Sequence, residues 1–267
     1  MTEHDTRLAN LLLRCAAPLS GLRRVPVVGG LLSWTSRKLV PRESLVWVRI
    51  QKGPSKDLWI RVNPRTGQNA QRGIGEPEVQ RALLEHLRPG MTFYDLGANI
   101  GFFSLMAARL VGPEGHVFSF EADPEIATRL RENLSRNQFT HAQVVQKAVW
   151  SENTTVSFAR VDPGTSPDRG LGHVSAGGSE SGIITVETVT LDQFAAANPA
   201  PDFLKCDVEG AEVAAFQGAA ELLAKKHPIL LVEMHSPENQ RALLRQFASF
   251  GYQCRQLDET HLLALPQ

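Results

Sequence analysis

The segment that most constrains the fold is an apolar strand that ends in a carboxylate, turns through two glycines and enters an apolar helix. Its sequence, FYDLGANIGFFS, runs from Phe93 to Ser104. Glycine lets the backbone approach a ligand closely, and the start of a helix offers free N–H groups and a partial positive charge. We therefore expect an α/β sheet with a binding crevice at the carboxyl end of this strand.

Short apolar runs alternate with helical patterns from this point onward, which is typical of a mostly parallel sheet flanked by helices. We expect strands at residues 92–96, 116–121, 143–149, 203–207 and 228–235. Helices are expected at residues 101–111, 124–137 and 212–225. The polar, glycine-rich stretch of residues 161–182 predicts a mobile loop.

Alternating hydrophobicity predicts three further antiparallel pairs of strands. They are an inserted ribbon from residues 154–159 and 183–188, a terminal hairpin from residues 252–257 and 261–265, and a small upstream hairpin from residues 45–50 and 58–62.

The chain has 267 residues, of which 42% are hydrophobic, and can bury one large core. We expect residues 71–267 to form one cofactor-binding domain, preceded by an extension of residues 1–70 that contains the small hairpin. Residues 1–60 carry ten Lys and Arg against four Asp and Glu, a net +6, so the remainder carries −6 because the whole chain balances 28 against 28. The main domain therefore has no charge signature of a nucleic-acid partner.

The first forty residues are leucine-rich, but arginines and prolines interrupt every 18-residue apolar run, which excludes a spanning helix. Residues 1–40 are therefore expected to form a basic amphipathic segment that either packs on the domain or makes peripheral contact with a membrane. The three cysteines, Cys15, Cys206 and Cys254, form no CxxC pair. A reduced, cytoplasmic setting without structural zinc is expected, with membrane association left open.

The glycine turn distinguishes between cofactors. A dinucleotide fingerprint, G-x-G-x-x-G, has a middle glycine that admits the pyrophosphate, whereas this turn has only Gly97 and Gly101, with Asp95 just before them. A carboxylate there repels a pyrophosphate but suits the ammonium and sulfonium charges of S-adenosylmethionine. Glu121, at the end of the next strand, can accept both ribose hydroxyls, although capping of the following helix is the alternative for it.

Five blocks in order resemble the FkbM family of methyltransferases, from about Glu76 to the C-terminus. They are GEPE at residues 75–78, DLGANIGFFSL at 95–105, FEADP at 120–124, KCDVEGAE at 205–212 and LLVEMH at 230–235. The resemblance implies a Rossmann-like class I methyltransferase fold, with a mostly parallel seven-stranded sheet, an antiparallel terminal strand and the inserted ribbon. It also implies S-adenosylmethionine as methyl donor.

The resemblance further implies the residues that contact the cofactor. Asp95, Gly97, Asn99, Gly101 and Ser104 would line its methionine end, Glu121 its ribose, and Ala148, beside Lys147, its adenine, with Glu76 approaching from upstream. One departure is that the acid usual after the third strand is replaced by Trp150-Ser151-Glu152. Either Ser151 or Glu152 could take the adenine amino group.

The resemblance implies most often a hydroxyl acceptor on a sugar, lipid-linked or natural-product molecule, whose proton a general base would take. Candidates lie where the fourth and fifth strands end: Asp207 and Glu209, then Glu233 and His235. Each pair has the i, i+2 spacing that puts both side chains on one side of an extended segment. We favour Asp207 or His235 as base, with Glu209 catalytic or acceptor-binding, over a divalent ion held by these groups, since no spacing demands a metal.

Two other functions compete with O-methylation. A nucleotide-dependent oxidoreductase would use the same strand order, but the third glycine is absent. A non-catalytic Rossmann-like binding module would not need both a complete glycine turn and an acid-rich strand edge.

Overall fold

The computed structural model describes residues 45–64, 66–160, 173–174 and 182–267. The chain splits into two compact units, Met1–Gly73 and Ile74–Gln267. The predicted amphipathic segment of residues 1–40 lies outside the described residues. Within the described part of the chain, no helix is both long enough and apolar enough to cross a membrane.

The first unit contains the predicted upstream hairpin. Strands β1 (Val46–Arg49) and β2 (Trp59–Val62) pair antiparallel, and the short helix α3 (Gln68–Arg72) follows. Alternate hairpin residues, Val46, Val48, Ile60 and Val62, are buried, as the period-2 pattern requires.

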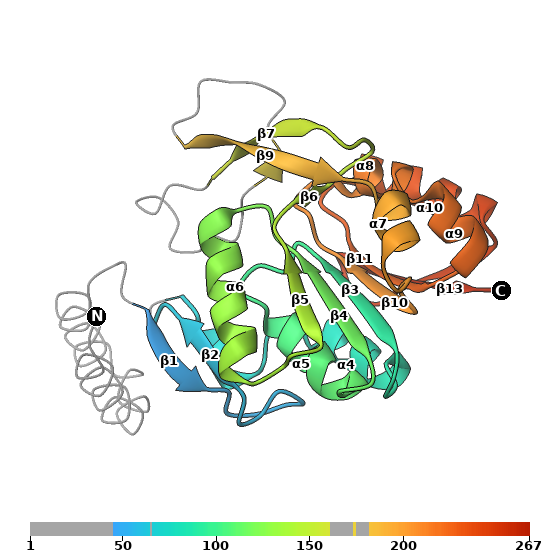
Figure 1. Cartoon of the computed structure of the whole chain (residues 1–267). Coiled ribbons are helices and arrows are strands. Elements are labelled where there is room, and N and C mark those ends of the chain that lie inside the picture. Colours follow the sequence, from blue (N-terminus) through green and yellow to red (C-terminus); the bar gives the residue numbers. More distant parts are fainter. Residues whose placement is uncertain (1–44, 65, 161–172, 175–181) are drawn as a thin grey trace, which may run out of the picture. The chain divides into compact units, whose positions relative to one another are not determined.

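The second unit is built on a seven-stranded sheet with the order β12-β13-β11-β10-β3-β4-β5 (Figure 1). The five strands that pair in parallel are β3 (Thr92–Leu96), β4 (His116–Phe120), β5 (Ala142–Val145), β10 (Phe203–Cys206) and β11 (Ile229–Glu233). The terminal hairpin completes the sheet: β13 (His261–Pro266) pairs antiparallel with both β11 and β12 (Tyr252–Gln256). The predicted mostly parallel sheet with an antiparallel last strand is confirmed.

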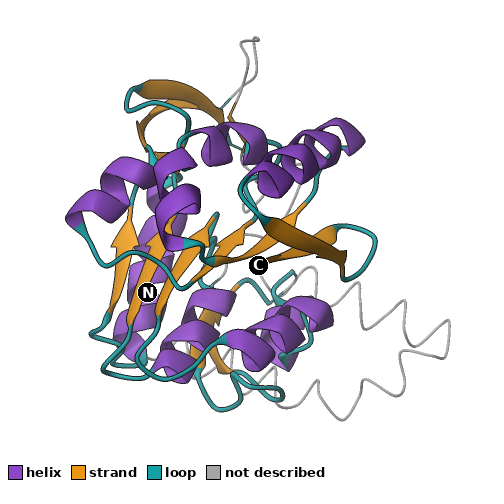
Figure 2. Cartoon of the chain, turned by 90° about the vertical axis from the view of Figure 1, so that its right-hand side faces the viewer, coloured by secondary structure: helices purple, strands orange, loops and turns teal. Residues whose placement is uncertain are grey.

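Helices cover both faces of this sheet (Figure 2). Residues of α4 (Pro77–His86) and α5 (Phe102–Val111) form one apolar cluster with the sheet. The other cluster gathers residues of α7 (Leu191–Ala197), α8 (Glu212–Gln217), α9 (Ala220–Lys226) and α10 (Pro237–Ser249). Helix α6 (Pro124–Arg136) follows β4.

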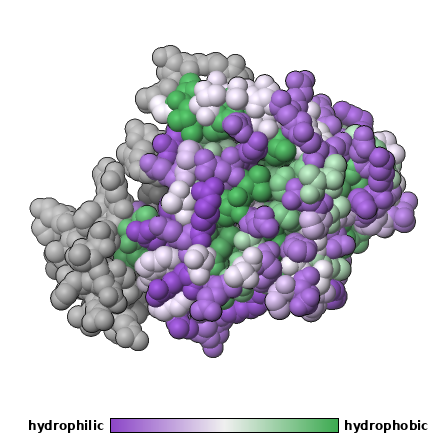
Figure 3. Space-filling view, viewed as in Figure 1, coloured by the Kyte–Doolittle hydropathy of each residue, from purple (hydrophilic) through white to green (hydrophobic). Residues whose placement is uncertain are grey.

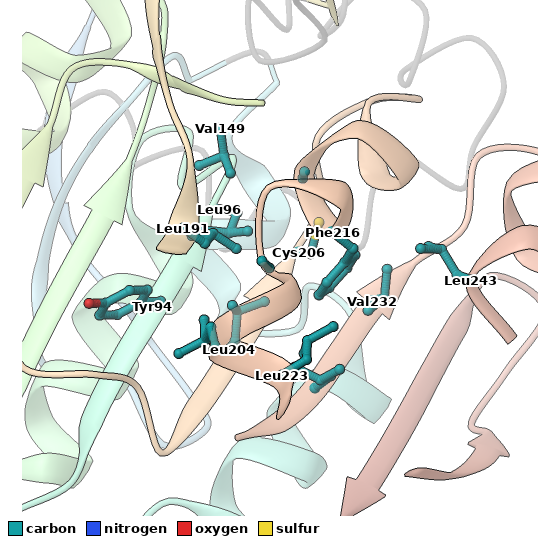
Figure 4. Packing of buried hydrophobic residues seen from close by; sticks show 14 of the residues in the cluster. Tyr94, Leu96, Val149, Leu191, Leu204, Cys206, Phe216, Leu223, Val232 and Leu243 are labelled. Carbon is teal, nitrogen blue, oxygen red and sulfur yellow. The ribbon is translucent and has the colours of Figure 1, made fainter. Parts of the chain in front are cut away.

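Strand β10 shows how alternation divides the two layers. Leu204 and Cys206 point with Val232 of β11 toward Phe216 and Leu223 (Figure 4). Phe203 belongs to the opposite cluster. The surface in Figure 3 is mostly polar, with apolar side chains gathered over β5 and α7.

The predicted strand at residues 143–149 is wrong in one respect, because it is two strands in different sheets. The N–H of Lys147 donates to the carbonyl oxygen of Val145 at 2.9 Å. This tight turn ends β5. The chain then enters β6 (Ala148–Val149), which pairs with β9 (Ile183–Val189) in a separate sheet of order β6-β9-β7-β8.

The predicted helix at residues 212–225 is interrupted, which gives α8 and α9. Gly218 lies at the break, and a Cβ there would be 2.3 Å from the carbonyl oxygen of Trp150. The carbonyl oxygen of Gly218 accepts the N–H of Asp192 at 2.9 Å. Contacts with distant segments therefore end the helix.

The inserted ribbon is confirmed, since β7 (Thr155–Ala159) pairs antiparallel with β9. The stretch of residues 161–182, predicted to be a loop, also contains a short strand, β8 (His173–Val174), which pairs with β7. Residues 161–172 and 175–181 of that predicted loop lie outside the described residues.

Candidate active site

The glycine turn between β3 and α5 takes backbone conformations that favour glycine. Gly97 and Gly101 have φ of 73° and 87°, and Asn99 between them has φ of 50°. A Cβ on Gly101 would lie 2.2 Å from Leu130 of α6, and one on Gly97 would lie 1.7 Å from the carbonyl oxygen of Asp207. Conformation favours glycine at both positions, and the backbone of Asp207 also excludes a side chain at Gly97.

Asp95 lies beneath this turn rather than on its surface, because the residue is 1% exposed. Its Oδ2 accepts the hydroxyl of Ser104 at 2.6 Å, and Ser104 in turn accepts the hydroxyl of Ser119 at 2.8 Å. Its Oδ1 is buried and has no hydrogen-bond partner in the described part of the chain. Burial raises the pKa of Asp95, and the nearby positive charge of Lys205 opposes this.

Lys205, in β10, is a buried cation between two carboxylates. It is 3% exposed. Its Nζ lies 3.2 Å from Oδ2 of Asp207 and 3.8 Å from Oδ1 of Asp95, and 5.2 Å from the ring centre of Phe103. Burial acts to lower the pKa of Lys205, but Asp207 and Asp95 raise it overall. Lys205 therefore links Asp95 in β3 to Asp207, which directly follows β10.

Glu121 follows β4 and binds two backbone segments. Its Oε2 accepts the N–H of Asn99 at 2.9 Å, and its Oε1 accepts the N–H of Asp123 at 2.8 Å. Burial raises the pKa of Glu121 to about 7. The N-cap of α6 is Asp123, whose side chain accepts the N–H groups of Glu125 and Ile126. Glu121 is thus tied to the glycine turn, and each carboxylate oxygen keeps a further acceptor position.

The inserted ribbon is attached beside Glu121. Arg160, directly after β7, donates to both carboxylate oxygens of Asp123, at 2.6 Å from Nε and 3.0 Å from Nη2. Ala148, predicted to lie near the adenine, is buried and clusters with Phe158 and Val186 of the ribbon. Ala122, the neighbour of Glu121, packs against the same cluster. The ribbon and the predicted ribose residue are therefore parts of one packed region.

Asp207 begins the turn after β10, directly against the glycine turn. Its N–H donates to the carbonyl oxygen of Leu96 at 3.0 Å. Its Oδ1 lies 3.7 Å from Nε2 of His235, and Oε2 of Glu209 lies 3.3 Å from the same nitrogen. Ligand atoms of Asp207, His235 and Glu233 also lie within 4.8 Å of one another, so the structure brings together all four residues predicted for the acceptor side.

His235 is oriented by Glu212, whose side chain is fully buried. Nδ1 of His235 lies 2.7 Å from Oε1 of Glu212, and Glu212 also accepts from the N–H of Gly210 and the side-chain amide of Asn239. The hydrogen bond with Glu212 raises the pKa of His235 to about 9. The imidazole therefore holds its second proton near neutral pH.

Glu76 and Glu233 meet at His261, the first residue of β13. Nε2 of His261 lies 3.4 Å from Oε2 of Glu76 and 3.7 Å from Oε2 of Glu233. Burial and the charge of Asp207 raise the pKa of Glu233 to about 7. Burial acts to lower the pKa of His261, but Glu76 and Asp258 raise it overall.

Sequence reasoning singled out no role for Lys205, Glu212, Arg160 or His261. In the sequence, Lys205 could have been noticed as a charged residue inside the apolar strand FLKC. His261 could have been noticed as a histidine three residues after Asp258. Two sets of three side chains could each hold a metal ion, since the ligand atoms within a set lie within 4.8 Å of one another. One set is Glu76, Glu233 and His261, and the other is Asp207, Glu233 and His235.

The residues around the glycine turn fit the S-adenosylmethionine expected from the sequence. Oδ1 of Asp95, which lies 3.8 Å from Nζ of Lys205 and accepts no hydrogen bond in the described part of the chain, leaves an acceptor beneath the turn that suits the ammonium group of the ligand. The carboxylate of Glu121, which accepts the N–H of Asn99 in the turn, can also accept hydroxyl hydrogens.

Comparison with known proteins agrees with this geometry. The hexuronic acid methyltransferase AglP of Haloferax volcanii is 29% identical over 164 residues, which are 61% of this chain and 63% of that protein. The arsenite methyltransferase of Halobacterium salinarum is 30% identical over 102 residues, which are 36% of this chain and 25% of that protein. The chain therefore spans less than two thirds of the length of either relative.

A crystal structure of methyltransferase FkbM from Methylobacillus flagellatus aligns with a TM-score of 0.48 and 19% identity, covering 75% of this chain and 58% of that one. Residues 95–254 match the methyltransferase FkbM domain. This match runs from Asp95 of the glycine turn to Cys254 in β12 and so includes most of the site. The chain belongs to the FkbM family of S-adenosylmethionine-dependent methyltransferases.

Proposed function

We propose that this chain methylates a hydroxyl oxygen of a sugar or another polyhydroxylated small molecule, free or lipid-linked. Asp207 carries this assignment, because its backbone contacts the glycine turn while Oδ1 of its carboxylate lies 3.7 Å from Nε2 of His235, which follows β11. A carboxylate next to the methyl donor is suited to take the proton that a hydroxyl loses. The similarity to AglP, a hexuronic acid methyltransferase, supports a sugar acceptor.

The chain's own residues would divide the work as follows. Asp95, Gly97, Asn99, Gly101, Ser104 and Glu121 would hold the cofactor, with Ala148 on the adenine side and Glu76 near the methionine end. When bound, the cofactor supplies a methyl carbon activated by a sulfonium. Asp207 would accept the hydroxyl proton as the oxygen–carbon bond forms, and Glu209 and His235 would orient the acceptor.

The carboxylates of the acceptor side suit a hydroxyl acceptor. Asp207, Glu209 and Glu233 are all partly exposed there. A neutral hydroxyl can donate a hydrogen bond to one of these carboxylates.

We expect the purified full chain to transfer a tritiated methyl group from S-adenosylmethionine to a sugar in a panel of hexosides, hexuronides, phenols and peptide amines. An ether formed on a hydroxyl keeps its label in mild alkali, whereas a methyl ester releases it as methanol. Alkali-stable label on a sugar is the expected result. Alkali-labile label, or label confined to the amines, would refute the hydroxyl assignment.

Replacing Glu121 by alanine should weaken S-adenosylhomocysteine binding by about 2 to 3 kcal/mol, the range for hydrogen bonds to a charged group. This corresponds to a roughly 30- to 150-fold higher Kd by calorimetry. The affinity of the wild type should also fall as the pH drops below about 7, because Glu121, with its pKa of about 7, then protonates and loses acceptor capacity.

Glu121→Gln should remove this pH dependence, since the amide does not titrate. The exposed Glu114, replaced by alanine, is the matched control and should bind as the wild type does. If Glu121→Ala retains wild-type affinity, Glu121 only joins the turn to α6.

A further inference from the structure

His261 is buried, yet one of its ring nitrogens has no hydrogen-bond partner. Its side chain is 7% exposed. Within the described residues, Nε2 forms no hydrogen bond. The other nitrogen, Nδ1, lies 2.9 Å from both carboxylate oxygens of Asp258. A histidine held through Nδ1 by a carboxylate points Nε2 in a fixed direction, which is the usual arrangement of a metal-binding histidine. Because the carboxylates, against the effect of burial, raise the pKa of His261, a metal ion would displace the proton on Nε2.

Two carboxylates face this nitrogen without forming hydrogen bonds to it. Nε2 is 3.4 Å from Oε2 of Glu76 and 3.7 Å from Oε2 of Glu233. Oε2 of Glu76 is itself buried and lacks a hydrogen-bond partner in the described part of the chain. Ligand atoms on a tetrahedral ion with bonds of about 2.1 Å are about 3.4 Å apart. The distances from Nε2 to the two carboxylates are therefore compatible with three ligands around a common ion.

The charges around His261 also favour a cation. Glu233 lies within 4.8 Å of ligand atoms in both sets, so the carboxylates of Glu76, Glu233 and Asp207 converge on one region. The positive charge of Lys205 pairs with Asp207 and with Asp95 in β3. Carboxylates brought this close are stable when a positive charge compensates them.

We propose that Glu76, Glu233 and His261 bind a divalent transition-metal ion, with Asp258 as the residue that orients the histidine. An imidazole ligand favours Zn²⁺ over Mg²⁺ or Ca²⁺, and the two carboxylates also suit Mn²⁺. Three protein ligands leave a coordination position for a water or an acceptor oxygen. Because Glu233 also adjoins Asp207, the ion would lie on the acceptor side of the site.

The test uses the full chain, stripped with EDTA and then dialysed against Zn²⁺, Mn²⁺ or Mg²⁺. Metal analysis should find about one equivalent of Zn²⁺ or Mn²⁺ per chain and no Mg²⁺ under the same conditions. Zn²⁺ should raise the melting temperature of the wild type. Glu76→Gln and His261→Gln should abolish both effects, and Asp258→Asn should weaken metal affinity roughly 10- to 100-fold.

His116→Gln, which changes an exposed histidine in β4, is the matched control and should retain the ion. A cooperative melting transition in EDTA establishes that each variant folds. If His261→Gln does not fold, because its side chain is buried, Glu76→Gln alone tests the site. The proposal is overturned if the wild type retains no metal or if Glu76→Gln retains it fully. It is equally overturned if only Asp207→Asn and His235→Gln lose the ion, which would assign it to the other set. None of these readouts uses an acceptor, so they fail or succeed independently of the proposed function.

Discussion

Asp207→Asn should lower turnover by roughly 100- to 10,000-fold, the usual contribution of a positioned general base. The asparagine oxygen can still accept a hydrogen bond from Nζ of Lys205, so the surroundings of the site are preserved. Because proton transfer matters mainly in the transition state, binding of S-adenosylhomocysteine should change little. Single-turnover rates with a labelled methyl donor and calorimetric Kd values, measured side by side, give the two quantities.

Glu238→Gln provides the matched control, because Glu238 is an exposed acid in the first turn of α10. It should keep wild-type turnover. If Asp207→Asn keeps nearly full activity, Asp207 is not the general base and only shapes the turn after β10. If a chelator reproduces the loss in the wild type, Asp207 acts by holding a metal ion.

Lys205→Met should destabilise the protein by about 3 to 5 kcal/mol at pH 7, the cost of leaving buried charges without their partner. Asp95 and Asp207 lose their common cation, and methionine replaces the buried stem without its charge. Urea unfolding followed by circular dichroism measures the difference in the free energy of unfolding.

The pH dependence of this loss has a defined sign. Burial already raises the pKa of Asp95 in the wild type. Removing Lys205 raises that pKa further, and a carboxyl whose folded pKa is raised stabilises the fold at low pH and loses this stability as the pH rises. The destabilisation should therefore be smaller at pH 5 than at pH 7.

Lys225→Met is the matched control, since Lys225 pairs with Glu221 on the exposed surface of α9. Such exposed pairs contribute little, so no measurable change is expected. Equal stability of Lys205→Met and the wild type at pH 7 would show that the two carboxylates do not depend on Lys205.

Most of the fold was predictable because its signals are local. The strand–glycine–helix segment around Gly97, the Asp123-Pro124 start of α6 and the alternating hairpins each carry their own pattern in the sequence. Strand β5 and helix α8 were predicted too long, because a tight turn at Lys147 and the packing of Gly218 against Trp150 end them. The second contact joins residues far apart in sequence, so no local pattern announces it.

The residues of the site also divide into those that the sequence predicts and those that only the structure shows. Strand-end acids such as Asp207 and Glu233 are placed together by topology alone, since parallel strands end at one edge of the sheet. Lys205 and His261 required the structure, because only the pairing of β10 with β3 and of β13 with β11 brings them to those acids. Arg160 likewise reaches Asp123 only after the inserted ribbon has folded back.

The close approach of Gly97 to Asp207 changes how the glycine motif should be interpreted in other chains of this fold. The space that a side chain at position 97 would need is filled by the backbone of the neighbouring turn. A descendant that had stopped binding the cofactor would still unfold or distort if this glycine were replaced. Its retention therefore reports that the two turns pack together, and does not by itself report that a ligand is bound.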